Sequence, residues 1–196
     1  MMRIALLIGL GAVAACSPKT TTTTESVSIS QTVVVSAAPV ESVSAQPLNV
    51  ISAEGYGPLR IGMTRAQVIE ALGPDANPNA VGGPDEAACD MFRPTRAPQG
   101  FLVMIEKGVL TSVWASRESG IPSDTGLKGN DPATKVKQTY GAALETERHH
   151  YVDSPAEYLT TWSTKDRAVR YEIGNDGKVD SIAGGGRSIT YVEGCS

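Results

Sequence analysis

Apolar and charged residues alternate in residues 169–173, which read Val-Arg-Tyr-Glu-Ile. A period of two residues predicts a β-strand, here with its apolar side chains toward a core and Arg170 and Glu172 pointing outward. Residues 174–177, Gly-Asn-Asp-Gly, suit a tight turn, and residues 178–182 then resume a strand pattern. The pattern therefore predicts a strand, a turn and a second strand.

Residues 101–105, Phe-Leu-Val-Met-Ile, are apolar at every position. An unbroken apolar run of this length is typical of a strand that is covered on both faces. The following turn, residues 106–108, leads into Val109-Leu110-Thr111-Ser112-Val113. This region therefore predicts a second strand–turn–strand unit.

Two short segments have the spacing of helices rather than strands, and both end in the pattern Val-x-x-x-(Leu or Tyr)-Gly. Thr64 and Asp131 are suited to cap the amino termini of these helices, and Pro132 suits the first helical position. An apolar pair four residues apart forms one face, and a glycine ends each helix. The residues concerned are Val68, Leu72 and Gly73 in the first segment and Val136, Tyr140 and Gly141 in the second.

The helical segments and the strand pairs recur at nearly equal offsets. Leu59 corresponds to Leu127 at an offset of 68 residues, and Gly108 corresponds to Gly177 at an offset of 69. Helices followed by antiparallel strands define an α+β fold. We therefore predict two tandem α+β repeats, residues 49–120 and 121–196.

The amino terminus has a different character. Residues 1–15 contain one arginine, then an apolar stretch, then Val-Ala-Ala directly before Cys16, which are the parts of a cleaved export signal. The stretch is shorter than the roughly 20 residues that a membrane-spanning helix needs. It resembles a bacterial lipoprotein signal, and this resemblance implies a diacylglycerol and an acyl chain, such as palmitate, on Cys16. In the lipoproteins that this signal resembles, a residue such as Ser17 after the lipidated cysteine goes with sorting to the outer membrane, so the resemblance also implies that location.

Residues 16–48 are rich in serine, threonine, alanine, proline and valine and show no helical period. Such a composition cannot build a core, so we predict a disordered tether between the lipid and the folded residues. Residues 26–30 and 32–35 have strand propensity, and local pairing there is the alternative.

The composition limits the classes of function. The chain has 17 Lys and Arg against 21 Asp and Glu, a net charge of −4, with no basic run, which argues against binding to nucleic acid. With Cys16 assigned to lipid, Cys89 and Cys195 remain as an even pair in an exported chain. We predict a disulfide between them, and two free buried thiols are the alternative.

The motif Ile61-Gly62-Met63-Thr64, followed by Val68 and Leu72-Gly73, resembles the helix-plus-sheet module of the beta-lactamase-inhibitor-protein-like superfamily. That superfamily also includes outer-membrane assembly lipoproteins of the SmpA/OmlA type. The resemblance implies a binding or assembly protein whose sheet meets a protein partner. It implies no catalytic residues.

The sequence contains little recognisable chemistry. The dinucleotide-like pattern of residues 9–14 lies inside the predicted signal, and residues 175–180 fit a hairpin turn better than a calcium loop. His149 and His150 are adjacent, so on a strand they would point to opposite faces and could not chelate one metal together. The alternative is that one of them serves as a zinc ligand or catalytic base near Asp153 or Glu157. We predict no cofactor, no metal and no small-molecule substrate.

Three aromatic residues are candidates for partner binding: Trp114, Tyr158 and Trp162. Aromatic residues are enriched at interface hot spots, and Tyr158 and Trp162 share one strand face. The alternative is that they pack in the core against the helices.

These observations favour a non-enzymatic lipoprotein on the periplasmic side of the outer membrane that binds an unknown envelope protein. The alternatives are an inhibitor of a secreted or periplasmic enzyme and a purely structural envelope protein. A hydrolase that uses His149 or His150 is a further alternative.

Overall fold

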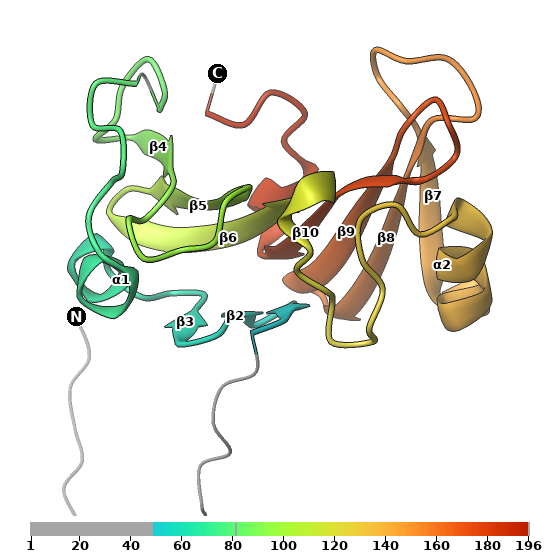
Figure 1. The fold of residues 1–196 in the computed structure, drawn as a ribbon, viewed down its shortest axis with the longest axis horizontal. Coiled ribbons are helices and arrows are strands. Elements are labelled where there is room, and N and C mark those ends of the chain that lie inside the picture. Colours follow the sequence, from blue (N-terminus) through green and yellow to red (C-terminus); the bar gives the residue numbers. More distant parts are fainter. Residues whose placement is uncertain (1–48, 81, 196) are drawn as a thin grey trace, which may run out of the picture. The chain divides into compact units, whose positions relative to one another are not determined.

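A seven-stranded antiparallel sheet is the main feature of the computed structural model, which describes residues 49–80 and 82–195 (Figure 1). Its strand order is β4-β5-β6-β10-β9-β8-β7. The bounds are β4 (Cys89–Phe92), β5 (Phe101–Glu106), β6 (Val109–Ser116), β7 (Leu144–Arg148), β8 (Glu157–Thr164), β9 (Arg167–Ile173) and β10 (Val179–Gly185).

The remaining elements are short. A three-stranded sheet consists of β1 (Ile51–Ser52), β2 (Gly55–Tyr56) and β3 (Leu59–Arg60). The α-helices are α1 (Arg65–Leu72) and α2 (Ala133–Tyr140), and the 3-10 helices are η1 (Arg117–Ser119), η2 (Gly141–Ala143) and η3 (Arg187–Thr190). None of the helices within the described residues is long and apolar enough to cross a membrane. The predicted α+β class is confirmed.

Both predicted helices are present. Thr64 caps α1 as expected, and its side chain and that of Gln67 form a reciprocal capping box. The cap of α2 differs from the prediction by one residue, because Pro132 is the N-cap. Asp131 instead accepts a hydrogen bond from the backbone N–H of Lys128 and pairs with Lys135, so its carboxylate orders the preceding turn.

The helices contribute their predicted apolar faces to a single core. Val68 and Val136 are fully buried, and Leu72 and Tyr140 pack beside them. Tyr140 also hydrogen-bonds through its hydroxyl to that of Tyr171 on β9, at 2.9 Å. Both α-helices therefore pack on the same side of the large sheet.

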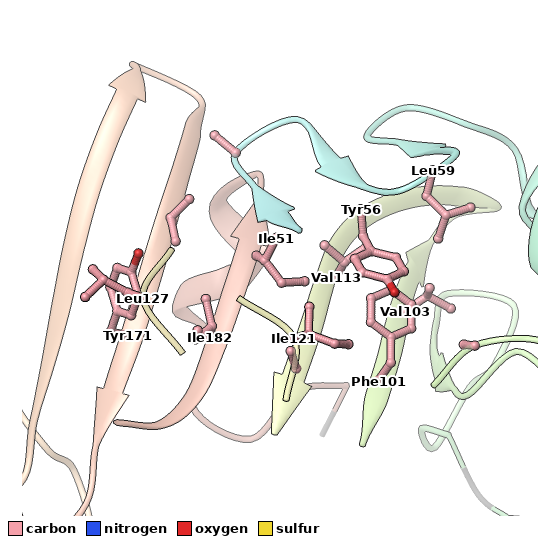
Figure 2. Close-up of a cluster of buried hydrophobic side chains, with 14 of the residues drawn as sticks. Ile51, Tyr56, Leu59, Phe101, Val103, Val113, Ile121, Leu127, Tyr171 and Ile182 are labelled. Carbon is pink, nitrogen blue, oxygen red and sulfur yellow. The ribbon is translucent and has the colours of Figure 1, made fainter. Parts of the chain in front are cut away.

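The small sheet covers the middle of that side (Figure 2). Ile51, Tyr56 and Leu59 are buried there, and the ring of Tyr56 lies 4.4 Å from that of Phe101 between centroids. Ile121 and Leu127, from the connection before α2, complete the covering. We call this side of the sheet the covered face.

Both predicted strand–turn–strand units form, as β5–β6 and β9–β10. They meet in the centre of the sheet, where β6 pairs with β10 and Ala115 lies opposite Ile182. The expected tandem repeats are not clear in the described residues. Three strands follow α1 and four follow α2, and all seven share one continuous sheet, so neither half has a sheet of its own.

Candidate functional site

The opposite side of the sheet, which we call the second face, is more polar. Because side chains alternate along a strand, β9 places Tyr171 in the core and Arg170 and Glu172 on the second face. Tyr158 on β8 and Ser181 on β10 lie opposite Glu172 on either side. These four side chains, including Arg170 one row away, come from the three strands β8, β9 and β10.

Arg170 is buried, contrary to the prediction that it would face outward into solvent. Its relative exposure is 5%, and its guanidinium lies over the ring of Tyr158 at 3.9 Å from the centroid. Among the described residues only Glu147 accepts a hydrogen bond from it, at 3.4 Å. Burial lowers the pKa of Arg170, and the carboxylate of Glu147 opposes this effect. The arginine is held mainly by a cation–π contact.

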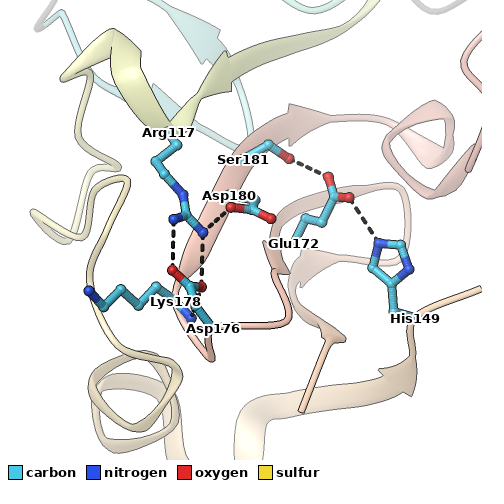
Figure 3. A network of polar contacts seen from close by, with 7 residues as sticks. All are labelled: Arg117, His149, Glu172, Asp176, Lys178, Asp180 and Ser181. Atoms are coloured by element: carbon cyan, nitrogen blue, oxygen red, sulfur yellow. Dashed lines mark hydrogen bonds and ion pairs between the residues drawn. The ribbon is translucent and has the colours of Figure 1, made fainter. Parts of the chain in front are cut away.

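Both ring nitrogens of His149 form hydrogen bonds within the protein. Its Nδ1 accepts hydrogen bonds from the backbone N–H groups of Tyr151 and Val152, at 3.1 and 3.2 Å. Nε2 therefore carries the proton and donates it to Glu172 at 3.0 Å (Figure 3). The second carboxylate oxygen of Glu172 accepts from Ser181 at 2.8 Å. The serine thus contacts a carboxylate and not an imidazole, which is not the order of a catalytic triad.

The two histidines do not point to opposite faces. Strand β7 ends at Arg148, so the strand rule does not apply to the loop that follows. The rings of His149 and His150 both contact the ring of Tyr158, with centroid-to-centroid distances of 4.7 and 5.9 Å. Their carboxylate partners are Glu172 and Glu147, and not Asp153 or Glu157 as in the alternative of a zinc ligand or catalytic base.

The turn that resembled a calcium loop is closed by an arginine. Arg117 forms ion pairs with Asp176, at 2.8 Å, and with Asp180 (Figure 3). The Arg117 guanidinium lowers the pKa of Asp176. Within residues 49–80 and 82–195, no group of three His, Cys, Asp or Glu side chains could hold a metal ion.

The C-terminal residues cross the second face. We call residues 186–195 the strap; they include η3 and end beside β4. Ile189 is 1% exposed and packs with Ala168 and Ala183, while Trp114 and Trp162 border the cluster. The Cys89–Cys195 disulfide joins the strap to edge strand β4, which confirms the predicted pairing.

A small cavity lies beneath the strap. Its volume is about 30 Å³, which holds about one or two water molecules and no larger ligand. Its lining includes Arg170, Glu172 and Ser181 from the sheet and Ile189, Tyr191 and Val192 from the strap. Since Arg170 has donor groups beyond the one that Glu147 accepts, water is a suitable occupant. The cavity is therefore suited to ordered water rather than to a larger ligand.

An open groove of about 490 Å³ lies on the outer side of the strap. Tyr151, Tyr191 and Val192 line it, and the disulfide also lines it. Tyr151 donates its hydroxyl hydrogen to Glu193, and Tyr191 donates to Glu106. These carboxylates raise the pKa of both tyrosines, so the phenols stay protonated.

The groove is bordered by exposed apolar groups. Tyr151 is 66% exposed and Tyr191 is 44% exposed, and Val152 and Val192 beside them are also exposed. We call these four side chains the rim. No local sequence signal marked them, because each pair lies outside the regular strands and follows neither period.

The three predicted partner-binding aromatics all lie on the second face. Tyr158 is 5% exposed, between Arg170 and His149. Trp114 donates to Ser112, and Trp162 donates to Glu145 and lies under Arg187. None of them packs against the α-helices, which occupy the covered face. The rim side chains are more exposed to solvent than Tyr158.

Cys16 and the predicted tether, residues 16–48, lie outside the described residues, as does the signal, residues 1–15. The lipid on Cys16 stays a prediction. The disulfide itself is typical of proteins in oxidising, extracytoplasmic compartments.

Neither a scan of protein-family models nor a search of curated proteins finds a match to this chain. Among solved structures, a DUF4309 family protein (YjgB) from Bacillus subtilis subsp. subtilis str. 168 has a TM-score of 0.43 and 15% identity, covering 63% of this chain and 78% of that one. An extracellular protein containing a SCP domain from Bacillus anthracis str. Ames has a TM-score of 0.41 and 8% identity, covering 65% and 44%. These likenesses are distant, and the resemblance to the beta-lactamase-inhibitor-protein-like superfamily stays a prediction.

Proposed function

We propose that this chain is a non-enzymatic binding protein of the cell envelope, anchored to the outer membrane through lipid on Cys16, and that it contacts a protein partner through the rim. The observation that carries the proposal is an open groove lined by the exposed side chains of Tyr151, Tyr191 and Val192, with the exposed Val152 next to Tyr151 in the chain.

Exposed apolar side chains are common one at a time, but a contiguous group around a concavity marks interaction surfaces. Tyrosine is among the residues that dominate binding energy at such surfaces, since it combines a large apolar area with a hydroxyl group. The rim is also ordered, because Tyr151 and Tyr191 are each hydrogen-bonded to a carboxylate. A partner would therefore bind a surface that loses little conformational freedom.

The histidine geometry supports a non-enzymatic role. The acceptor nitrogen of His149 is occupied by two backbone N–H groups, so this ring offers no base to a substrate. His150 is exposed and pairs with Glu147. Replacing His150 with glutamine is expected to leave partner binding in place.

Photocrosslinking in intact cells tests the proposal. A photoreactive amino acid at Tyr151 or Val192 is expected to give a discrete adduct with one envelope protein, whereas the same group at Gln138 on α2 is expected to give none. The Tyr151→Ala/Tyr191→Ala double variant should abolish the adduct formed from Val192 while its thermal unfolding stays unchanged. Equal adducts from the rim and from Gln138 would contradict the proposal.

The anchor has a separate test. Radiolabelled palmitate is expected to label the wild-type protein and not the Cys16→Ala variant. Unchanged labelling of that variant would remove the lipid part of the proposal and leave the binding part intact.

A further inference from the structure

We propose that the groove beside the Cys89–Cys195 disulfide receives an arginine side chain from an extended segment of the partner. This inference rests on the proposed function and adds the chemistry of the partner.

The charge of the groove is one-sided. Glu106 and Glu193 line it, and no lysine or arginine of the described residues does. Glu106 receives a hydrogen bond from Tyr191, and no cation among the described residues forms an ion pair with it. The hydrogen bond fixes the orientation of the Glu106 carboxylate.

Covering this groove would remove Glu106 from water. An apolar or acidic segment would leave a desolvated carboxylate without a counter-charge, which is costly. A basic side chain would supply the missing charge. A partner segment that binds both the apolar rim and the acidic groove should therefore carry a basic residue next to apolar ones.

Two tyrosine rings favour arginine over lysine. Tyr151 and Tyr191 both line the groove, and a planar guanidinium can stack on such rings while it donates to carboxylates. An ammonium group has the charge but neither the flat shape nor the paired donors. The same molecule already shows this preference within its own fold, where Arg170 lies over Tyr158 and Arg187 over Trp162.

A second groove of about 280 Å³ on the other side of Tyr191 has the opposite character. Arg167 and Arg187 line it together with Glu106. An acidic partner would bind preferentially there, so the two grooves make opposite predictions for charge-removing substitutions. Glu106→Gln and Arg187→Gln are therefore a matched pair of variants.

A random peptide library displayed on phage is panned against the full-length protein with its disulfide intact. The enriched peptides are expected to carry arginine flanked by apolar residues. For the strongest synthetic peptide, Glu106→Gln should weaken binding roughly three- to tenfold, and Arg187→Gln should leave it unchanged. Replacing the peptide's arginine by lysine should weaken binding as well.

Enrichment of acidic peptides, a greater loss with Arg187→Gln than with Glu106→Gln, or no enrichment of arginine over the input library would each overturn the inference. The proposed function is judged separately, by the crosslinks formed from Val192. A partner that crosslinks there through a segment without arginine would leave the proposed function standing and refute the inference. Thermal unfolding of both variants checks that they fold.

Discussion

The two faces of the seven-stranded sheet are both largely buried, but by different means. On the covered face, Phe101 and Tyr171 lie in an apolar core closed by the small sheet and the two helices. On the second face, Arg170 and Glu172 lie under a strap of ten residues, 186–195, and are held by a cation–π contact and hydrogen bonds. Strand β9 contributes side chains to both faces, so Tyr171 is buried by apolar packing and Arg170 is buried by polar and cation–π contacts.

Under the proposed function, the difference separates the residues that stabilise the fold from those that contact the partner. Apolar packing on the covered face supplies most of the stability, because burial of apolar area is the main favourable term in folding. The second face buries less apolar surface and ends in an open groove with an exposed rim. Changes on the covered face should therefore act on stability, and changes at the rim should act on binding.

The sharpest test of the comparison uses two neighbours on β5. Phe101 is fully buried on the covered face, whereas Leu102 is 37% exposed on the second. Phe101→Ala is expected to lower the free energy of unfolding by about 4 kcal/mol, since it leaves a large cavity. Leu102→Ala should cost less than about 1 kcal/mol. Urea denaturation measures both, and equal losses would contradict the division between the faces.

Removal of the disulfide should affect the second face most. The bond joins residues 106 apart in the sequence, and replacing Cys89 and Cys195 with serine is expected to cost about 2–4 kcal/mol. Hydrogen exchange should accelerate in the strap before it accelerates in β5 or β9. Uniform acceleration across the sheet would show that the strap is not a separate, weaker unit.

The cation–π contact should contribute a smaller amount. Arg170→Met keeps the apolar stem but removes the charge over Tyr158, with an expected loss of about 1 kcal/mol in thermal or urea unfolding. Arg148→Met, at an exposed position of β7, is the matched control and should be neutral. A gain in stability for Arg170→Met would mean that apolar packing suits the second face equally well.

The smallest expected difference between the two faces is in the loss of folding stability at high pH. Burial raises the pKa of Tyr171 on the covered face, and burial together with Glu172 raises that of Tyr158 on the second face. In the unfolded chain both ionise near 10.0, so the stability that depends on the neutral phenols is complete below pH 10 and is lost as the pH rises further.

Tyr171→Phe should flatten this alkaline decline more than Tyr158→Phe, as measured by urea unfolding at several pH values. The larger effect is expected because Tyr171 is fully buried, whereas Tyr158 lies at the edge of a cavity. Equal effects of the two substitutions, or a larger effect of Tyr158→Phe, would contradict the prediction.

Local patterns predicted the parts of the fold that depend on local chemistry. Helix α1 begins after Thr64 and ends before Gly73, as predicted. The alternation of residues 169–173 correctly predicted strand β9 with Val169, Tyr171 and Ile173 in the core. The disulfide followed from the even number of cysteines left after Cys16 was assigned to lipid. Each of these inferences needed only neighbouring residues or a count.

The site could not be predicted in the same way. Arg170 is buried because the strap folds back over β9, and a charged residue in an alternating strand carries no sign of such a cover. Tyr151 and Tyr191 become neighbours of one groove only after β7, β8 and the strap are in place. Period-based reasoning selected Trp114, Tyr158 and Trp162 because they lie on strands, and it passed over the exposed tyrosines in loops.

The most direct test of the account is the affinity of the crosslinked partner for three forms of the full-length protein: the wild type, the Tyr151→Ala/Tyr191→Ala variant and Gln138→Ala. The account predicts that the double variant loses at least about tenfold in affinity with unchanged unfolding, and that Gln138→Ala binds like the wild type. Equal affinities for all three forms would contradict the assignment of binding to the rim.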